Sequence, residues 1–371
     1  MSLAMPLHIC FFGYTLASSC GGDVTYVSGL AQKLVKSGYR VSIATKECAP
    51  AYAKISGVKY IALGRYASKN KSISVQFKFA YNALKFFATH KRFDCIHSIS
   101  SSYLFAVLTI LIRFINPAAA VHTLSHNIKV KSFYRLLDKL ICSSRRIYAR
   151  SPGNAVYIPY FVDLNKIKNA IPFRFRNKSS RIVAVIGPPN KRRGFIYFVR
   201  AIPLVQRRFP DAYFVMALDL NDIEFDSDTR MQLRKINNTI ASYGLTNLKV
   251  IGQVDVARFM NSIDVLVYPV QTVRRLVDIP PTILEGMAGS GIVISTAKGA
   301  ISEVIENQRN GLLINESDCQ NHNILAGKIT QVLFDKSLRT RMNRNAHQTV
   351  TSFNIESIYN EIEKVYRTVS V

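Results

Sequence analysis

The chain of 371 residues is poor in acidic side chains, with 23 Asp and Glu against 49 Lys and Arg. Its formal net charge is +26 and its sequence pI is near 10.0. Residues 1–163 hold 21 basic and only 5 acidic residues, whereas the remainder holds 28 and 18. Such an excess favours a polyanionic partner, which is a nucleic acid, an anionic membrane or a phosphorylated small molecule. A charge that serves solubility alone is the alternative.

Several common motifs are missing as well. None of the six cysteines forms a C-x-x-C pair, which excludes the usual zinc and redox motifs. Cys10 and Cys95 lie in apolar runs and are predicted to be core residues in a reducing cytosol. The start has no basic segment of the kind that opens a secretory signal, and no nucleic-acid-binding module is recognisable. We therefore predict a cytoplasmic protein with no nucleic-acid partner.

A long apolar run is also absent. The most apolar stretch, residues 103–115 "YLFAVLTILIRFI", has 13 residues and includes Arg113. A membrane-spanning helix needs about 20 residues. The stretch is therefore predicted to be a buried helix or one that lies at an interface.

Short apolar runs alternate with stretches of helical period along most of the chain. In the first half we expect strands at 7–12, 40–45, 59–63, 94–99, 119–124 and 146–150, and helices at 24–37, 74–90, 103–115 and 131–141. In the second half we expect strands at 181–186, 213–218, 248–251, 263–268, 291–295 and 311–314, and helices at 194–208, 227–242, 282–289 and 322–335. Strands joined by crossover helices indicate parallel sheets, so the fold class is α/β with two doubly wound domains.

The boundary between the domains is expected near "IPYFVDL", which a polar and basic stretch follows. This gives a first domain at 1–163 and a second at 164–351. The pattern after Ser337 is helical to the end, and a helix at 352–371 is expected to pack back on the first domain.

Two glycine-containing loops each follow the first strand of a domain. Gly21 and Gly22 precede an amphipathic helix, where a phosphate can approach the backbone and the helix N-terminus. A tight turn with Asp23 as the helix cap is the alternative. The loop at 187–194, "GPPNKRRG", contains three cations, and Arg192 and Arg193 can grip a pyrophosphate by bidentate contacts. A solvated loop is the alternative, but ligands of open α/β sheets bind at this strand end.

Residues 278–291, "DIPPTILEGMAGSG", combine a helix start that carries one carboxylate, Glu285, with three glycines. Pro281 and Thr282 are typical of a helix N-terminus, and Glu285 follows in its first turns. A carboxylate there can accept two hydrogen bonds from a ribose diol, or it can simply favour the helix dipole. The glycines are expected to let this helix pack closely on the sheet.

Two further patterns bear on catalysis. His126 follows a strand end and is expected to face the ligand, while His122 lies inside the run and is expected to be buried. A structural histidine is the alternative for both. Asp226 and Asp228 form a D-x-D pair before a helical stretch, where capping explains them better than a metal does. We therefore predict no catalytic metal.

Taken together, these segments resemble family 4 retaining glycosyltransferases of the GT-B fold. The similarity is carried by "GGDVTYVSGLAQKLVKSGYRVSIAT", "DCIHSIS", "IPYFVDL", "GPPNKRRGFIYFVRAIPLV" and "PPTILEGMAGSGIVISTAKGAISEVIENQRNGLLI". The resemblance implies two Rossmann-like domains facing a central cleft, with a UDP- or GDP-linked sugar mainly on the second and an acceptor mainly on the first. It implies sugar transfer with retention of configuration and no cofactor besides the donor.

The resemblance also implies roles for particular residues. Glu285 looks like the second glutamate of the family's E-x7-E motif, which binds ribose. Arg193 is similar to the basic residue that neutralises the pyrophosphate, with Arg192 beside it. Gly22 corresponds to the glycine loop near the phosphates, and His126 to the histidine that contacts the donor sugar.

The chain departs from the family pattern at two places. Pro188 stands where the family has the first basic partner of its R…K-G pair, and Arg192 is the residue that can compensate. Val277 stands where the family has its first glutamate, and Asp278 is the nearest carboxylate that can replace it. Pro280 and Pro281, which follow, have no N–H to offer a donor phosphate. A binding or assembly subunit that keeps the GT-B fold without donor chemistry is therefore the alternative function.

The basic first domain suggests where an acceptor would come from. Residues 65–92 interleave seven cations with Phe77, Phe79, Phe86 and Phe87, and residues 129–150 add seven more cations. A basic amphipathic surface without a span is typical of peripheral docking on anionic lipid. We predict a lipid-linked or membrane-bound acceptor at the inner face of the cytoplasmic membrane, with a basic cytosolic surface as the alternative.

Overall fold

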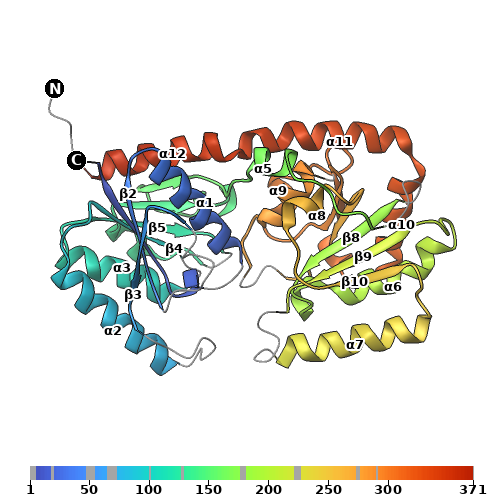
Figure 1. Cartoon of the computed structure of the whole chain (residues 1–371), viewed down its shortest axis with the longest axis horizontal. Coiled ribbons are helices and arrows are strands. Elements are labelled where there is room, and N and C mark those ends of the chain that lie inside the picture. The colour runs from blue at the N-terminus through green and yellow to red at the C-terminus, as the bar shows by residue number, and fades with distance from the viewer. Residues whose placement is uncertain are drawn as a thin grey trace. The chain divides into compact units, whose positions relative to one another are not determined.

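The computed structural model shown in Figure 1 divides the chain into two compact units. One unit comprises Met1–Tyr160 with Ile355–Val371, and the other comprises Phe161–Asn354. The structure describes residues 6–17, 21–46, 55–64, 73–99, 102–126, 129–175, 181–220, 227–272, 276–289 and 291–370.

The first unit is built on a parallel sheet with the strand order β3-β2-β1-β4-β5-β6-β7. Its strands are β1 His8–Phe12, β2 Arg40–Thr45, β3 Val58–Ala62, β4 Cys95–Ile99, β5 Ala119–Leu124, β6 Lys139–Cys142 and β7 Ala155–Tyr157. Its helices are α1 Gly22–Lys36, α2 Ile73–Thr89, α3 Tyr103–Ile115, α4 Arg145–Tyr148 and α12 Ile355–Val369, with short 3₁₀ helices η1 Tyr14–Ala17 and η3 Ser132–Leu136. Strands β1 and β4 are buried along their whole length, and Cys10 and Cys95 are core residues as predicted.

Helices α2 and α3 pack side by side over one face of this sheet (Figure 1). They share a core with β1, because Phe79 and Phe87 of α2 and Leu108 of α3 pack around Phe12. Helix α2 connects β3 to β4 and α3 connects β4 to β5, so both connections run in the same direction along the sheet. Right-handed connections that run in one direction place their helices on the same face. Helix α1 connects β1 to β2 in the opposite direction and therefore covers the other face.

The prediction for residues 131–150 was wrong. The expected helix at 131–141 is the 3₁₀ helix η3 followed by strand β6, and the expected strand at 146–150 is helix α4. Strand β6 is short and buried, and it pairs with β5 and β7 on either side. The hydrogen bonds of two neighbouring strands thus outweigh the local helical period. Helix α4 begins where the Ser144 hydroxyl accepts a bond from the Ile147 backbone N–H at 3.2 Å.

The last helix, α12, belongs to the first unit and is held by polar contacts at both ends. Lys33 of α1 bonds Glu356 at 2.5 Å, and the Tyr39 hydroxyl donates to Glu363 at 2.7 Å. The Tyr366 hydroxyl lies 2.6 Å from Nδ1 of His97, which is fully buried in β4. Burial lowers the pKa of His97 to about 3, so this imidazole is neutral at neutral pH.

The second unit is built on a parallel sheet with the strand order β10-β9-β8-β11-β12-β13. Its strands are β8 Ile182–Gly187, β9 Tyr213–Leu218, β10 Leu248–Ile251, β11 Val265–Tyr268, β12 Val293–Thr296 and β13 Leu312–Ile314. Its helices are α5 Leu164–Lys168, α6 Phe195–Gln206, α7 Ser227–Tyr243, α8 Val256–Met260, α9 Pro281–Ala288, α10 His322–Phe334 and α11 Lys336–Val350, with 3₁₀ helices η4 Lys191–Arg193, η5 Ile301–Glu303, η6 Glu316–Asp318 and η7 Thr351–Phe353. The strands predicted for this half are confirmed to within two residues.

Alternate residues of β8 point to opposite faces and enter two different cores. Val183 and Val185 pack with α6 and α10, whereas Ala184 packs with α8 and α9. This unit is therefore covered by helices on both faces, as a doubly wound sheet requires.

The glycines after Glu285 allow helix α9 to lie against the sheet, as predicted. A Cβ on Gly286 would stand 2.4 Å from the Leu266 side chain of β11. One on Gly289 would stand 2.8 Å from the backbone of Met260 in α8. Side chains at these two positions would push α9 away from its neighbours, so the position of Glu285 depends on both glycines.

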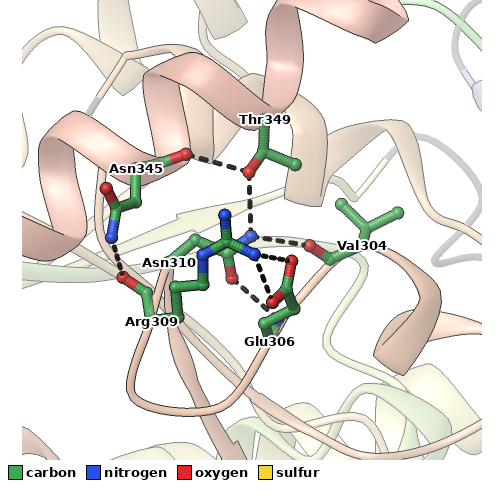
Figure 2. A network of polar contacts seen from close by, with 6 residues as sticks. All are labelled: Val304, Glu306, Arg309, Asn310, Asn345 and Thr349. Carbon is green, nitrogen blue, oxygen red and sulfur yellow. Dashed lines mark hydrogen bonds and ion pairs between the residues drawn. The ribbon is translucent and has the colours of Figure 1, made fainter.

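A buried amide fixes the turn that precedes β13 (Figure 2). Asn310 is 1% exposed and donates to the Val304 carbonyl and the Thr349 hydroxyl, both at 2.9 Å. Its side-chain oxygen accepts the Glu306 N–H at 2.7 Å. Since Thr349 lies in α11, this one side chain ties the turn to the helix.

Replacing Asn310 with Ala is expected to lower the free energy of unfolding by about 1 to 3 kcal/mol, because three hydrogen bonds are lost and the buried Val304 carbonyl loses this donor. Arg309→Ala is the control, since its ion pair with Glu306 is exposed and contributes less than about 0.5 kcal/mol. Urea unfolding of the three proteins measures both effects. Equal losses in the two variants would show that the amide network does not hold the turn.

Candidate active site

The candidate residues of the second unit lie where strands of the parallel sheet end. The loop at 187–194 follows β8, and residues 269–272 follow β11, which pairs with β8. The carboxyl ends of parallel strands share one edge of the sheet, and this edge is where open α/β sheets bind ligands.

Arg193 is held on the ring of Tyr268, the last residue of β11. Its Nη1 donates to the Tyr268 hydroxyl, and its guanidinium carbon lies 5.1 Å from the ring centroid. Tyr268 is 3% exposed, and burial raises the pKa of its hydroxyl while the nearby guanidinium opposes that rise. The arginine therefore keeps its charge at a fixed position beside a neutral phenol. The sequence analysis missed Tyr268.

Gly194 lets the basic loop approach the loop after β11. It adopts φ 68°, a left-handed conformation, and a Cβ there would stand 2.1 Å from the Pro269 carbonyl oxygen. The Gln271 N–H donates to the Arg192 carbonyl at 2.7 Å. The Gln271 side chain donates to the carbonyls of Pro269 and Cys319 at 2.8 and 2.7 Å. The bond to the Arg192 carbonyl fixes the backbone just before Arg193, and the two side-chain bonds fix the loop after β11 that Gly194 approaches.

Helix α9 begins at Pro281, as predicted, and places Glu285 in its second turn. The glutamate keeps part of its surface exposed, but its apolar surroundings raise the pKa of the carboxyl to about 7, while Lys166 of α5 opposes the rise. Thr282 is also partly exposed, whereas Asp278 is fully buried. In the part of the chain that the structure describes, no hydrogen bond or ion pair joins Glu285 to Arg193.

The first unit brings another group of polar side chains together at the carboxyl ends of its strands. Asp23, in the first turn of α1, accepts hydrogen bonds from the Tyr160 hydroxyl at 2.5 Å and the Ser125 hydroxyl at 3.3 Å. The Ser125 oxygen also lies 2.7 Å from Nδ1 of His126, which is 8% exposed. Tyr160 stacks on Tyr26 at 4.2 Å. His126 is thus linked through Ser125 to a carboxylate.

The predicted glycine loop precedes α1 as expected, but the alternative role for Asp23 was wrong. Gly21 occupies the cap position with φ 132°, and Gly22 is the first helical residue. Asp23 instead bonds side chains of two other segments. His122 is fully buried, as predicted, with Nδ1 2.7 Å from the Ser98 hydroxyl.

The described residues contain no group of three or more His, Cys, Asp and Glu that could hold a metal ion. Asp228 accepts the Lys191 backbone N–H at 3.0 Å, and Asp226 lies outside the described residues. Metal independence therefore stays a prediction.

Comparisons with known proteins identify similar sequences and similar folds. Residues 180–335 match a family model described as "Glycosyl transferases group 1". An uncharacterized glycosyltransferase of Methanocaldococcus jannaschii is 27% identical over 258 residues, which are 67% of this chain and 65% of the relative's length. Sucrose-phosphate synthase from Thermosynechococcus elongatus has a TM-score of 0.78 and 20% identity, with 98% of each chain covered. Anabaena HepE in complex with UDP and glucose has a TM-score of 0.73 and 15% identity, with 97% of this chain and 99% of HepE covered.

These likenesses confirm the predicted fold class, because two parallel-sheet units of this arrangement form a GT-B fold. The match at 180–335 includes Arg193, Tyr268 and Glu285. Together with the relative from Methanocaldococcus, it supports glycosyltransferase activity.

Glu285→Gln is expected to change the dependence of stability on pH. A carboxyl whose folded pKa of about 7 exceeds the ordinary 4.5 stabilises the fold below pH 4.5, and this contribution is lost as pH rises through 7. Between pH 4.5 and 7, the free energy of unfolding of the wild type should fall by about 1 to 3 kcal/mol more than that of Glu285→Gln.

Urea unfolding at a series of pH values measures this difference. Glu361→Gln, in an exposed ion pair with Lys364, is the control. A constant difference between wild type and Glu285→Gln over the whole range would contradict the raised pKa.

Proposed function

We propose that the protein is a retaining glycosyltransferase that moves a sugar from a UDP- or GDP-linked donor to an acceptor without a metal. The second unit binds the donor and the first binds the acceptor. The observation that carries the proposal is the fixed position of Arg193 on Tyr268, at a ligand-binding sheet edge and within the segment that matches the glycosyltransferase family model. The UDP and glucose bound by HepE, a structural neighbour, support a nucleotide-sugar donor here.

The charge that develops during transfer lies on the departing diphosphate. A guanidinium that is already oriented by a buried phenol stabilises this charge without reorganising, which is how oriented electrostatics lowers a barrier. In the proposal Arg193 and Arg192 bind the diphosphate, Glu285 binds the ribose, and Thr282 adds a donor contact. The acceptor attacks from the face that the nucleotide leaves.

Glu285 suits its proposed role chemically. A ribose diol donates two hydrogen bonds, which a carboxylate accepts better than a carboxylic acid does. Since the pKa of Glu285 is raised to about 7, bonds from a diol would favour the charged form and lower that pKa on binding. Asp278, whose side chain is fully buried, is proposed to replace the missing first glutamate.

Arg193→Ala is expected to weaken binding of UDP and GDP by roughly ten- to hundredfold, because a charge-assisted contact to phosphate is lost. Tyr268→Phe keeps the ring under the guanidinium and loses one hydrogen bond, so a smaller loss is expected. Arg344→Ala, an exposed arginine on α11, is the control. Titration calorimetry measures all four proteins, and unchanged affinity in Arg193→Ala would remove the proposed donor site.

Ser125→Ala is expected to lower kcat about tenfold or more with little change in the KM for the donor. The Ser125 hydroxyl donates to Asp23 and therefore accepts from Nδ1–H of His126. In a neutral imidazole this bond selects the tautomer whose Nε2 can accept a proton. Without this bond the imidazole loses its fixed tautomer and orientation. Steady-state kinetics checks the effect, and Ser125→Thr should restore most of the rate. A change confined to KM would contradict a positioning role.

A fold-retaining subunit without donor chemistry is the second candidate. Val277 in place of the first glutamate and the proline pair at 280–281 favour it, because both remove contacts that a donor would use. A panel of nucleotide sugars separates the candidates. Binding of a nucleoside diphosphate without transfer or hydrolysis of any sugar nucleotide indicates the subunit.

The acceptor is proposed to be lipid-linked or a membrane-bound glycan at the inner face of the cytoplasmic membrane. The support is the net positive charge of residues 1–163, which contain 21 basic and 5 acidic residues. Anionic lipid attracts such a surface.

A further inference from the structure

Helix α3 has an apolar side that its own unit does not cover. Phe105, Leu108 and Ile112 fill the core beneath it. On the opposite side Val107, Leu111 and Phe114 follow one another at helical spacing and are 39%, 47% and 69% exposed. A surface helix normally carries polar residues on its outer side, and a helix that is apolar all round is normally buried.

The neighbouring helix α2 extends this apolar surface. Phe77 and Tyr81 lie one turn apart and are 62% and 65% exposed. Two of the aromatic residues that the sequence analysis assigned to a basic surface, Phe79 and Phe87, are instead fully buried in the core. Because α2 and α3 pack side by side on one face of the sheet (Figure 1), we treat Phe77, Tyr81, Val107, Leu111 and Phe114 as one surface, the α2–α3 face.

The charged side chains around the α2–α3 face are mainly basic. Lys78 and Lys85 lie on the exposed side of α2, and Lys91 and Arg92 are exposed just after its end. Between residues 73 and 117 the only carboxylate in the sequence is Asp94, and it accepts the His8 backbone N–H at 2.6 Å. Beyond this segment, the partly exposed Asp138 pairs with Arg113 of α3 at 2.8 Å. Among the described residues, the exposed apolar side chains are therefore bordered by four cations without an acidic partner, Lys78, Lys85, Lys91 and Arg92, and by one arginine that an acid already neutralises.

We propose that the α2–α3 face docks on a membrane surface of anionic lipid, with Leu111, Phe114 and Phe77 entering the headgroup region and Lys78 and Lys85 binding lipid phosphates. The inference rests on the proposed membrane-bound acceptor and names the surface that meets the membrane. None of the described helices is long and apolar enough to cross a bilayer, so the contact is peripheral.

Charge argues against a second copy of the chain as the occupant. A two-fold dimer through this face would place each basic border against its own copy, because symmetric interfaces pair identical patches. Like charges brought together at an interface oppose association. A bilayer that contains anionic lipid offers both the apolar layer and the opposite charge.

Co-sedimentation with vesicles tests the proposal without any need for sugar transfer. Wild-type protein should bind vesicles of equal parts phosphatidylcholine and phosphatidylglycerol, and should bind phosphatidylcholine alone at least tenfold more weakly. Leu111→Glu with Phe114→Glu should reduce binding to the anionic vesicles at least tenfold. Phe334→Glu is the matched control, since Phe334 of α10 is an exposed phenylalanine (82%) in the other unit.

A second pair of variants tests the charge. Lys78→Glu with Lys85→Glu should weaken binding to anionic vesicles at least tenfold, because each basic residue near such a surface is worth about fivefold in affinity. Arg341→Glu with Arg344→Glu, two exposed arginines on α11, should behave as wild type. All these side chains are exposed, and circular dichroism verifies that each variant is folded.

Three results would overturn the inference: equal binding of wild type to both kinds of vesicle, unchanged binding by the α2 and α3 variants, or a wild-type dimer in sedimentation that Leu111→Glu with Phe114→Glu converts to monomer. The last result would assign the face to a second copy. Calorimetry with UDP and GDP keeps the two proposals apart. If the wild type binds UDP or GDP but does not prefer anionic vesicles, only the docking surface is overturned. If it prefers anionic vesicles but binds neither nucleotide, only the donor site is overturned.

Discussion

The close approach of Gly194 to the loop after β11 is the constraint on which the proposed donor site depends. Any side chain at this position would place a carbon 2.1 Å from the Pro269 carbonyl oxygen, and φ is 68° there. The contact brings the basic loop to the end of β11, and the preceding residue, Arg193, then meets the ring of Tyr268. A steric requirement at Gly194 thus sets the position of the charge on the residue before it. Arginine suits this position because its guanidinium stays protonated when it is partly buried.

The two units hold their candidate side chains by different means, and the difference agrees with the proposed division of labour. In the second unit a cation is stacked on a buried phenol, which presents positive charge to a diphosphate. In the first unit the Asp23 carboxylate orients Ser125 and Tyr160, and through Ser125 it orients His126. Such a network presents directed hydrogen-bond donors and acceptors around one carboxylate, and directed hydrogen bonds are what hydroxyl groups of a sugar require.

The sequence predicted the elements wherever an apolar run was long enough to show its period. Helix α3 has the predicted bounds, whereas β6 has only 4 residues and was taken for part of a helix. A run that short shows no period, and it becomes a strand because β5 and β7 offer hydrogen bonds on both sides. In α2, by contrast, the information was present: Phe79 and Phe87 are separated by two helical turns and so share one face.

Candidate site residues could be predicted only where a local motif marked them. Arg193 stands before the glycine that ends its loop, and Glu285 follows the start of its helix by four residues. Tyr268 could not be identified in this way, because its partner is 75 residues away and the tyrosine looks like the end of a strand. Tyr160 and Asp23 are 137 residues apart, and nothing local to either one indicates the bond between them. Such pairs become visible only when the sheet brings its carboxyl ends to one edge.

The proposed docking surface relates two unusual features of the first unit to each other, its shortage of acids and its apolar run too short to span a membrane. The core-facing side of α3 supplies Phe105, Leu108 and Ile112 to one core cluster and Ala106 and Ile110 to another. The opposite side adds nothing to those clusters and exposes apolar area to water, which favours association with another phase or partner. In the proposal, cations at its border favour an anionic membrane over a second copy of the chain, because they attract a polyanion and repel like charge. The nearby Asp94 is bonded to the His8 backbone N–H. An acceptor that resides in such a membrane would then be met by the unit proposed to bind it.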